Sequence, residues 1–355
     1  MPKTYRVGVV GFAHMHVTWL LDHFAALDNV EWVACADTVP LTPSLSDGAM
    51  TRAANIKHAQ DEIGVPKTYA DYHEMLDSEA FDIVIACPEN ARHGEVIEAI
   101  AGAGSHIITE KPPSASSGDF MRAVRAAELA GVELIVNWPS TWSGATRLVK
   151  EIADSGEIGQ VFQVKWRQGS MGPLPKLSER QRGAEWWHQS APGGGALLDY
   201  CCYGANISRW IIGESPEAVM GMTGNFASGY GDAEDNAALL VRYPSAMTIL
   251  ESTWSCVNHG ASSRHLVYGT EGTLAVEGNG VRVFKDSGEG SLREASGLPG
   301  GRDSVAKEAI HHFETGEPLH PTLTVPINID AMAILDAGIR SAASGKLEQC
   351  HSAIW

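Results

Sequence analysis

The stretch Arg6-Val7-Gly8-Val9-Val10-Gly11-Phe12-Ala13-His14-Met15-His16, near the N-terminus, decides the fold of this chain. Residues 6–11 form an almost unbroken apolar run, which is typical of a strand buried on both faces of a parallel sheet. A glycine turn follows, and apolar side chains then recur at helical spacing over residues 17–27. A strand, a glycine turn and a helix in this order predict the start of a doubly wound α/β fold.

Strands and helices continue to alternate through the first part of the chain. A loop rich in Pro, Ser and Thr is expected at 38–48. The alternation predicts a parallel sheet with right-handed crossovers, that is, a Rossmann domain over residues 1–140. The expected strands are 30–36, 81–86, 105–108 and 132–136, and the expected helices are 49–63, 94–103 and 117–130.

The pattern changes after about residue 150, where strands follow one another without intervening helices. This predicts a second α/β domain, residues 141–355, which has an open, mostly antiparallel sheet. The last helix is expected to pack back on the first domain. The strands are predicted at 161–168, 218–226, 237–243, 247–254, 265–268, 273–277 and 281–284, and the helices at 196–212, 304–315 and 329–343.

The composition excludes several classes of function. The 355 residues carry a net charge of −17 without a basic cluster, which argues against a nucleic-acid partner. No apolar run is long enough for a membrane span, and no signal peptide is recognised before residue 5. The six cysteines form no CxxC pair, so we expect reduced thiols in a cytoplasmic protein.

The glycine turn keeps only the first glycine of the dinucleotide fingerprint, Gly11. Ala13 still permits close approach of a pyrophosphate, whereas His16 replaces the glycine that allows tight packing of helix on strand. A purely structural turn is therefore an alternative. If the turn holds a dinucleotide, the residues that contact it are Gly11, Phe12, Ala13, His14 and Met15.

Asp37 favours the dinucleotide. It ends the second expected strand, where a carboxylate accepts hydrogen bonds from the adenosine ribose. No arginine follows in Thr38-Val39-Pro40 to hold a 2′-phosphate, so NAD is expected as the cofactor in preference to NADP.

A second motif, Thr109-Glu110-Lys111-Pro112, directly follows the strand expected at 105–108. A lysine just past a buried strand is unusual, and the proline behind it restricts the turn. The carboxyl ends of the strands of a doubly wound sheet open onto the ligand crevice. Lys111 is therefore a candidate proton-transfer group beside a bound nicotinamide.

These motifs together resemble the Gfo/Idh/MocA family of oxidoreductases over nearly the whole chain. The resemblance is carried by the glycine turn, by Cys87-Pro88-Glu89-Asn90 with His93, and by Glu110-Lys111-Pro112. In the second half it is carried by Gly193-Gly194-Gly195 before a helix with Asp199, by Glu234-Asp235-Asn236, and by Gly269-Thr270-Glu271-Gly272.

The resemblance implies roles for several of these residues. Pro88, Glu89 and His93 would line the nicotinamide end of the crevice, and Cys87 lies near the cofactor by position. Glu110 and Lys111 would be the cofactor and proton-transfer residues.

Asp199 and Tyr203 are four residues apart on the helix expected at 196–212, so their side chains share one face. The family usually has histidine at the second position. Tyrosine there resembles the subset that contains glucose–fructose oxidoreductase and the dihydrodiol and xylose dehydrogenases. A neighbouring ammonium stabilises tyrosinate, so we assign Tyr203 as proton acceptor, Lys111 as its partner and Asp199 as the group that holds them. The alternative is that Lys111 acts alone.

The remaining candidates have weaker support. His14 and His16 are spaced like metal ligands, but no third ligand is obvious, so no metal is expected and His14 is taken to border the cofactor or substrate. Trp187 either contacts the nicotinamide or a sugar, or belongs to the core.

The sequence thus predicts an NAD(P)-dependent oxidoreductase that acts on a secondary alcohol or ketone of a sugar, cyclitol or related polyol. Two rival hypotheses are an NAD-using glycoside hydrolase of the same family and a non-enzymatic sensor of a dinucleotide or sugar. The resemblance also implies that residues 141–355 serve substrate binding and oligomerisation. The expected partners are therefore a small-molecule substrate and further copies of the chain, in a homodimer or homotetramer.

Overall fold

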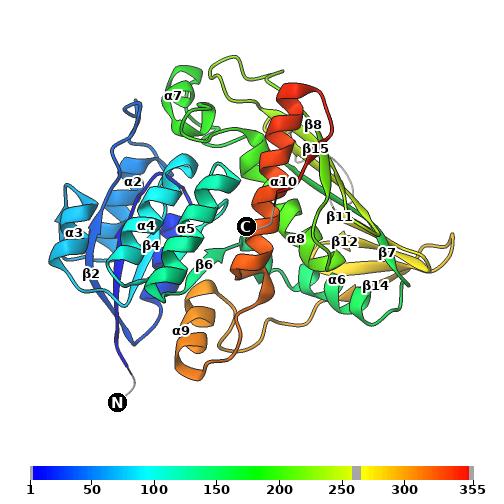
Figure 1. The fold of residues 1–355 in the computed structure, drawn as a ribbon, viewed down its shortest axis with the longest axis horizontal. Coiled ribbons are helices and arrows are strands. Elements are labelled where there is room, and N and C mark those ends of the chain that lie inside the picture. Colours follow the sequence, from blue (N-terminus) through cyan, green and yellow to red (C-terminus); the bar gives the residue numbers. More distant parts are fainter. Residues whose placement is uncertain (1–2, 258–264, 352–355) are drawn as a thin grey trace.

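A computed structural model of the chain, which describes residues 3–257 and 265–351, contains one sheet in each half of the sequence (Figure 1). The first sheet has six parallel strands in the order β3-β2-β1-β4-β5-β6. This is the strand order of a Rossmann fold, in which ligands bind at the carboxyl ends of the strands. The predicted fold class is confirmed. The strands are β1 Tyr5–Val10, β2 Val30–Ala36, β3 Thr68–Tyr69, β4 Ile83–Ala86, β5 His106–Glu110 and β6 Leu134–Asn137.

The apolar run of the first strand is explained by its central position in this sheet. Val7, Val9 and Val10 are completely buried, because β1 pairs with β2 on one edge and β4 on the other and helices cover both faces. The covering helices are α1 Val17–Ala25, α2 Arg52–Lys57, α3 Tyr72–Ser78, α4 His93–Gly102 and α5 Ser117–Ala130.

Three details of the first sheet differ from the prediction. The helix expected at 49–63 starts at Arg52, where the Thr51 side chain caps it, and its last turn, His58–Glu62, is π-helical. β5 runs on to Glu110, so this glutamate lies on the strand. β3 and α3 were not predicted, because a two-residue strand is too short to show alternation.

The second sheet has nine strands in the order β14-β13-β12-β11-β7-β10-β9-β8-β15. Its neighbours are antiparallel except for β10 and β7, which run parallel, so the expectation of a mostly antiparallel sheet is confirmed. The strands are β7 Val161–Gly169, β8 Ala218–Gly224, β9 Asn236–Arg242, β10 Met247–Thr253, β11 His265–Gly269, β12 Gly272–Glu277, β13 Gly280–Phe284, β14 Ser291–Glu294 and β15 Glu348–Gln349.

The helix expected at 196–212 has two parts. Leu197–Cys201 is a π-helical turn that leads into α8 Cys202–Ile212. Single π-helical turns are often found at functional sites, and this one contains Asp199. The helices α6 Gly144–Asp154 and α7 Glu179–Ala184, which were not predicted, complete this half.

The last two helices return toward the first sheet. α9 Val305–Thr315 packs on α1, and α10 Val325–Ser344 contacts α5 and β6 as well as α8 and β8 (Figure 1). A hydrogen bond of 2.8 Å from Trp138 Nε1 to Asn328 Oδ1 joins α10 to the residue after β6. The contact expected for the last helix is therefore present.

Within the two described ranges, each helix is either too short or too polar to cross a lipid bilayer.

Candidate active site

The glycine turn between β1 and α1 lies against the end of β4. Gly11 has φ +88°, and a Cβ placed on it would lie 2.5 Å from the backbone nitrogen of Pro88. Only glycine fits both the dihedral angle and the space. The amides of Ala13 and His14 donate to the carbonyl oxygen of Cys87, at 3.1 and 3.3 Å. Cys87 therefore contributes to the turn through its backbone.

The other turn residues divide between core and crevice. Phe12 is buried in the core, and its carbonyl oxygen accepts a hydrogen bond of 3.0 Å from Asn55 Nδ2. Met15, by contrast, lines a cavity that His14 and His16 also border. Burial raises the pKa of the Cys87 thiol well above its usual value, which makes it a poor nucleophile.

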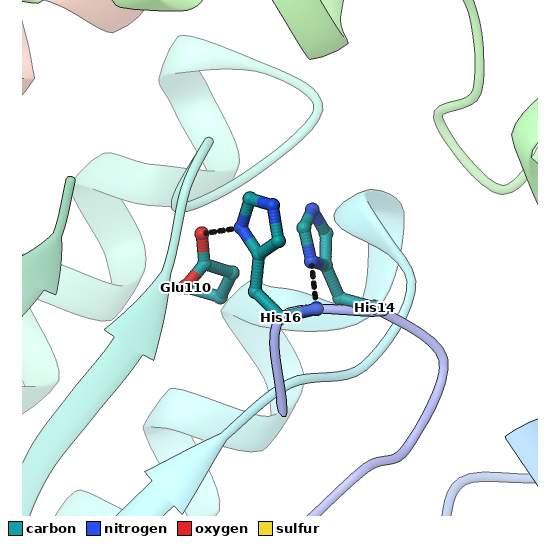
Figure 2. A group of neighbouring side chains, drawn as sticks. All are labelled: His14, His16 and Glu110. Atoms are coloured by element: carbon teal, nitrogen blue, oxygen red, sulfur yellow. Dashed lines mark hydrogen bonds and ion pairs between the residues drawn. The ribbon is translucent and has the colours of Figure 1, made fainter. Parts of the chain in front are cut away.

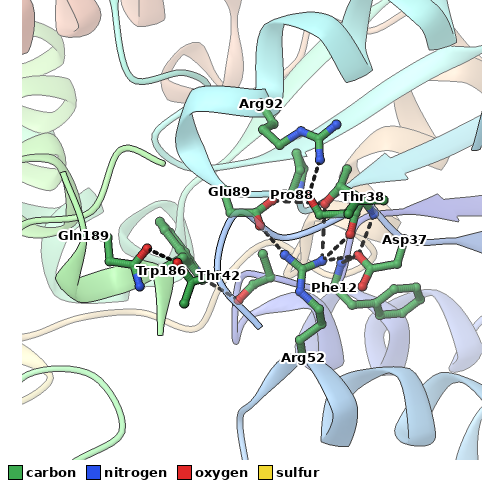
Figure 3. Close-up of polar contacts among 12 residues, drawn as sticks. Phe12, Asp37, Thr38, Thr42, Arg52, Pro88, Glu89, Arg92, Trp186 and Gln189 are labelled. Carbon is green, nitrogen blue, oxygen red and sulfur yellow. Dashed lines mark hydrogen bonds and ion pairs between the residues drawn. The ribbon is translucent and has the colours of Figure 1, made fainter. Parts of the chain in front are cut away.

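Asp37 lies at the end of β2, as predicted, but an arginine lies against it (Figure 3). Its Oδ1 accepts from the Phe12 amide at 2.9 Å and from Arg52 Nη1 at 2.5 Å. Arg52, the first residue of α2, also forms an ion pair with Glu89. Among the described residues these bonds end on Oδ1, which leaves Oδ2 to accept from a ribose hydroxyl.

The arginine contact corrects two expectations. An arginine is not found in Thr38-Val39-Pro40, but Arg52, farther along the chain at the start of α2, returns to Asp37 and was not predicted. Glu89 was placed at the nicotinamide end, but its carboxylate is bound by Arg52 and by Thr38 Oγ1, the latter at 3.0 Å, at the Asp37 end.

His93 holds the turn after β4 in place. Its Nε2 donates to the carbonyl oxygen of Pro88 at 3.2 Å, and its Nδ1 accepts from Thr109 Oγ1 at 3.0 Å. Burial lowers the pKa of His93 to about 4, so the ring is neutral at physiological pH. His93 and Pro88 therefore shape the crevice wall, and His93 is not placed to exchange protons with a ligand.

Lys111 and Asp199 form a buried ion pair between the two halves of the chain. Lys111 Nζ lies 2.7 Å from Asp199 Oδ1 and 3.1 Å from the Asp199 carbonyl oxygen. Burial alone would lower the pKa of Lys111, but Asp199 outweighs it and holds this pKa well above the usual value. Trp254, which the sequence did not suggest, donates from Nε1 to Asp199 Oδ2 at 3.1 Å.

Tyr203 lies beside this pair in a different arrangement from the one expected. Lys111 Nζ lies over its ring, 4.7 Å from the ring centroid, which is a cation–π contact. Burial raises the pKa of Tyr203, and Lys111 offsets only part of the rise. The lowered pKa that the sequence interpretation requires is therefore absent, and the side chain is a neutral phenol.

Two tryptophans from the second half cover the glycine turn. Trp186 Nε1 donates to the Ala13 carbonyl oxygen at 2.9 Å, and Trp187 stacks on Trp186 with 4.0 Å between ring centroids. Trp187 also packs edge-on against His14 and is almost fully buried. Trp187 therefore belongs to a small apolar cluster and also lines the cavity, and its contact with a nicotinamide or a sugar stays a prediction.

A cavity of about 450 Å³ lies between the glycine turn and the second half of the chain. A volume of this size is within the usual range for small-molecule sites. The cavity brings together groups from both halves: His14, Met15, His16, Trp187, Asp199 and Tyr203.

The crevice fits a dinucleotide. Gly11 leaves room that a Cβ would fill, the turn leads into the N-terminus of α1, and Asp37 keeps a carboxylate oxygen for a ribose. The site that the sequence placed at Gly11, Asp37 and Lys111 is thus assembled along one edge of the Rossmann sheet.

Comparison with known proteins agrees with this geometry. Residues 5–138 match the model of the oxidoreductase family with an NAD-binding Rossmann fold, and residues 146–275 match that of the GFO/IDH/MocA C-terminal domain. Myo-inositol 2-dehydrogenase of Thermotoga maritima is 24% identical over 284 residues, which cover 79% of this chain and 75% of the relative. 1,5-Anhydro-D-fructose reductase of Ensifer adhaerens is 26% identical over 300 residues, which cover 82% of this chain and 87% of the relative.

The fold is also found in solved structures. The crystal structure of aldose-aldose oxidoreductase from Caulobacter crescentus, complexed with glycerol, superposes with a TM-score of 0.77 at 21% identity. The superposition covers 98% of this chain and 100% of that one.

We expect the stability of the protein to fall as the pH decreases from about 6.5 to about 4. Burial lowers the pKa values of His93, His188 and His320 to about 4, so the unfolded chain binds these protons at higher pH than the folded one. Within this window each histidine contributes a slope of about 1.4 kcal/mol per pH unit to the free energy of unfolding. Urea unfolding at a series of pH values measures this slope.

His93→Asn should flatten this dependence, whereas replacement of the exposed His73 by Asn should leave it unchanged. Equal slopes for the His93 variant and the parent protein would contradict the assignment.

Proposed function

The chain belongs to the Gfo/Idh/MocA family of NAD-binding oxidoreductases, and we propose that it transfers hydride between NAD and a secondary alcohol or ketone of a sugar, cyclitol or related polyol. The observation that carries the proposal is the buried Lys111–Asp199 pair beside the cavity. An ammonium donates to the substrate oxygen as negative charge develops there. A carboxylate accepts from a neighbouring hydroxyl, which suits a polyol.

The named relatives support this substrate class. Both the inositol dehydrogenase and the anhydrofructose reductase act, by their names, on ring compounds with several hydroxyl groups. When bound, NAD supplies the hydride acceptor. Lys111, Asp199 and Tyr203 would bind and orient the alcohol, with Lys111 and the Tyr203 phenol as hydrogen-bond donors. The cavity would exclude water from the reacting carbon.

The two rival functions have less support. An NAD-using hydrolase releases a free sugar without net NADH, and a sensor has no need of a charged pair beside its ligand. The relatives named above are a dehydrogenase and a reductase, which favours oxidoreduction.

We expect purified protein to form NADH from NAD with at least one member of a panel of sugars, cyclitols and anhydrosugars. Lys111→Met should lower kcat by about 10²–10³-fold, because the ammonium that stabilises the developing charge is gone. The Lys111→Met substitution should leave the affinity for NAD unchanged, as measured by calorimetry. The matched control is Lys150→Met, which breaks a lysine–aspartate pair within α6. Release of free sugar without NADH, or full turnover by Lys111→Met, would contradict the proposal.

The preference for NAD over NADP is proposed to depend on Asp37, which neutralises Arg52 and repels a 2′-phosphate. Asp37→Asn keeps an acceptor for the Phe12 amide but removes the charge. We expect the ratio of NADP to NAD affinity to rise by about tenfold, which corresponds to about 1.4 kcal/mol. The double variant with Arg52→Met should lose this gain. An unchanged ratio in the single variant would show that Asp37 does not select the cofactor.

We also propose that the second sheet forms a homodimer interface. On β8 and β9 its outer face exposes three large apolar side chains: Met220 is 40%, Met222 71% and Leu240 46% exposed. Met220 and Leu240 are paired neighbours on β8 and β9, so they form one patch. Light scattering should give a dimer or a tetramer, that is, a dimer of dimers, and Met222→Lys should weaken the dimer. A monomeric parent protein would contradict the interface.

The cytoplasm is the location we propose, because all six cysteines are free thiols. A thiol titration of the unfolded protein that found fewer than six free thiols would count against it.

A further inference from the structure

His14, His16 and Glu110 form a buried cluster at the cavity wall (Figure 2). Glu110 ends β5, whereas both histidines belong to the glycine turn, so residues 94 positions apart meet here. One ligand atom of each residue lies within 4.8 Å of the other two. Both histidines line the cavity that also contains Asp199 and Tyr203.

The hydrogen bonds of His16 determine which of its nitrogens carries a proton. Nδ1 lies 2.8 Å from Glu110 Oε1, and a carboxylate only accepts hydrogen bonds, so Nδ1 is the donor. In a neutral ring, Nε2 is then an unprotonated acceptor. Figure 2 shows that Nε2 of His16 faces away from Glu110, on the same side as Nε2 of His14.

His14 has the opposite tautomer. Its Nδ1 accepts a hydrogen bond of 3.2 Å from the backbone amide of His16, so Nε2 carries the proton. This Nε2 is fully buried and has no hydrogen-bond partner among the described residues. Burial lowers the pKa of His14 well below its usual value, with smaller contributions from His16 and Lys111, so the ring is neutral. A buried donor without a protein partner needs an acceptor from outside the chain, such as a water or a ligand oxygen.

Hydrogen bonds also fix the position of Glu110. Its Oε2 accepts from Asn137 Nδ2 at 2.9 Å, and Asn137 Oδ1 accepts from Trp142 Nε1 at 3.2 Å. His16 stacks on Trp19 with 4.5 Å between ring centroids. The carboxylate and the imidazole ring are therefore fixed relative to each other.

We propose that His16, oriented by Glu110, is the proton acceptor of the reaction and that His14 donates a hydrogen bond to the same substrate oxygen. The inference rests on the proposed function and names the group that moves the proton. Lys111 is already protonated and Tyr203 is a neutral phenol, so neither offers a free acceptor. His16 Nε2 does.

In the oxidation, the hydroxyl proton of the substrate moves to Nε2 of His16. The C–H electron pair leaves as hydride to NAD⁺, and the carbon–oxygen bond becomes double. Glu110 then faces an imidazolium ring and stabilises its charge through the Nδ1–H bond. His14 Nε2–H and the Lys111 ammonium donate to the oxygen while it carries negative charge. The reduction reverses each of these movements.

A metal ion is the competing explanation for two histidines and a glutamate. It would require a free electron pair on Nε2 of His14, but Nδ1 already accepts the His16 amide. A neutral imidazole ring has only one unprotonated nitrogen. Metal binding would therefore break this hydrogen bond, and the geometry favours proton transfer.

The tautomers can be tested without any substrate. Long-range proton–nitrogen correlation spectra of the full chain with isotopically labelled histidine should show His16 protonated on Nδ1 and His14 on Nε2. Glu110→Gln can donate its amide to His16 and should move that proton to Nε2. The opposite tautomers in the parent protein, or a stoichiometric metal whose removal by EDTA abolishes turnover, would overturn the inference.

Turnover provides the second test. His16→Ala should lower kcat by about 10²–10⁴-fold, the usual contribution of a general base, and added imidazole should restore part of the loss. His16→Asn tests the same role if the alanine variant does not fold. The control is His58→Gln, which removes a comparable histidine–carboxylate pair with Asp22 at the surface and should leave kcat unchanged.

These outcomes separate the two proposals. If the parent protein forms NADH and His16→Ala matches it, the proton acceptor is another group although the proposed function holds. If the tautomers are as inferred but no polyol is oxidised, the proposed function fails.

Discussion

The ion pair between Lys111 and Asp199 is the interaction on which the site depends. It joins the end of β5 to the π-helical turn before α8, and both charges are buried where the two halves of the chain meet. A buried charge without its partner costs several kcal/mol, roughly 3–5 by comparison with other proteins, so the two halves are held in one relative position. The cavity and its polar groups are a consequence of this position.

The surroundings of each buried group determine whether it donates or accepts a proton within the site. Lys111 keeps its proton because Asp199 outweighs the effect of burial, whereas Tyr203 keeps its proton because burial outweighs Lys111. His14 stays neutral because its ring is buried among other basic groups. Lys111, Tyr203 and His14 thus offer donors at the cavity. Besides the Asp199 carboxylate, the acceptor is Nε2 of His16, because the bond to Glu110 places the proton on Nδ1.

Most of the fold and part of the site were predictable from the sequence, and the failures have physical reasons. Strands such as β2 are long and apolar enough to show their period, whereas β3 is too short. Lys111 and Asp199 were expected together, and the structure joins them in an ion pair. The assignment of Tyr203 as proton acceptor took account of a nearby ammonium but not of desolvation, and a sequence carries no measure of burial at an individual hydroxyl.

The sequence by itself determined the Rossmann sheet, the glycine turn and the acid at the end of β2, because periodicity, a positive φ and a strand end are local properties of the chain. Only the tertiary structure decided which side chains meet. Arg52 reaches Glu89 across 37 positions, and His16 reaches Glu110 across 94. Such contacts arise when β-strands assemble side by side, and no spacing in the sequence encodes the direction in which a carboxylate or an imidazole ring then points.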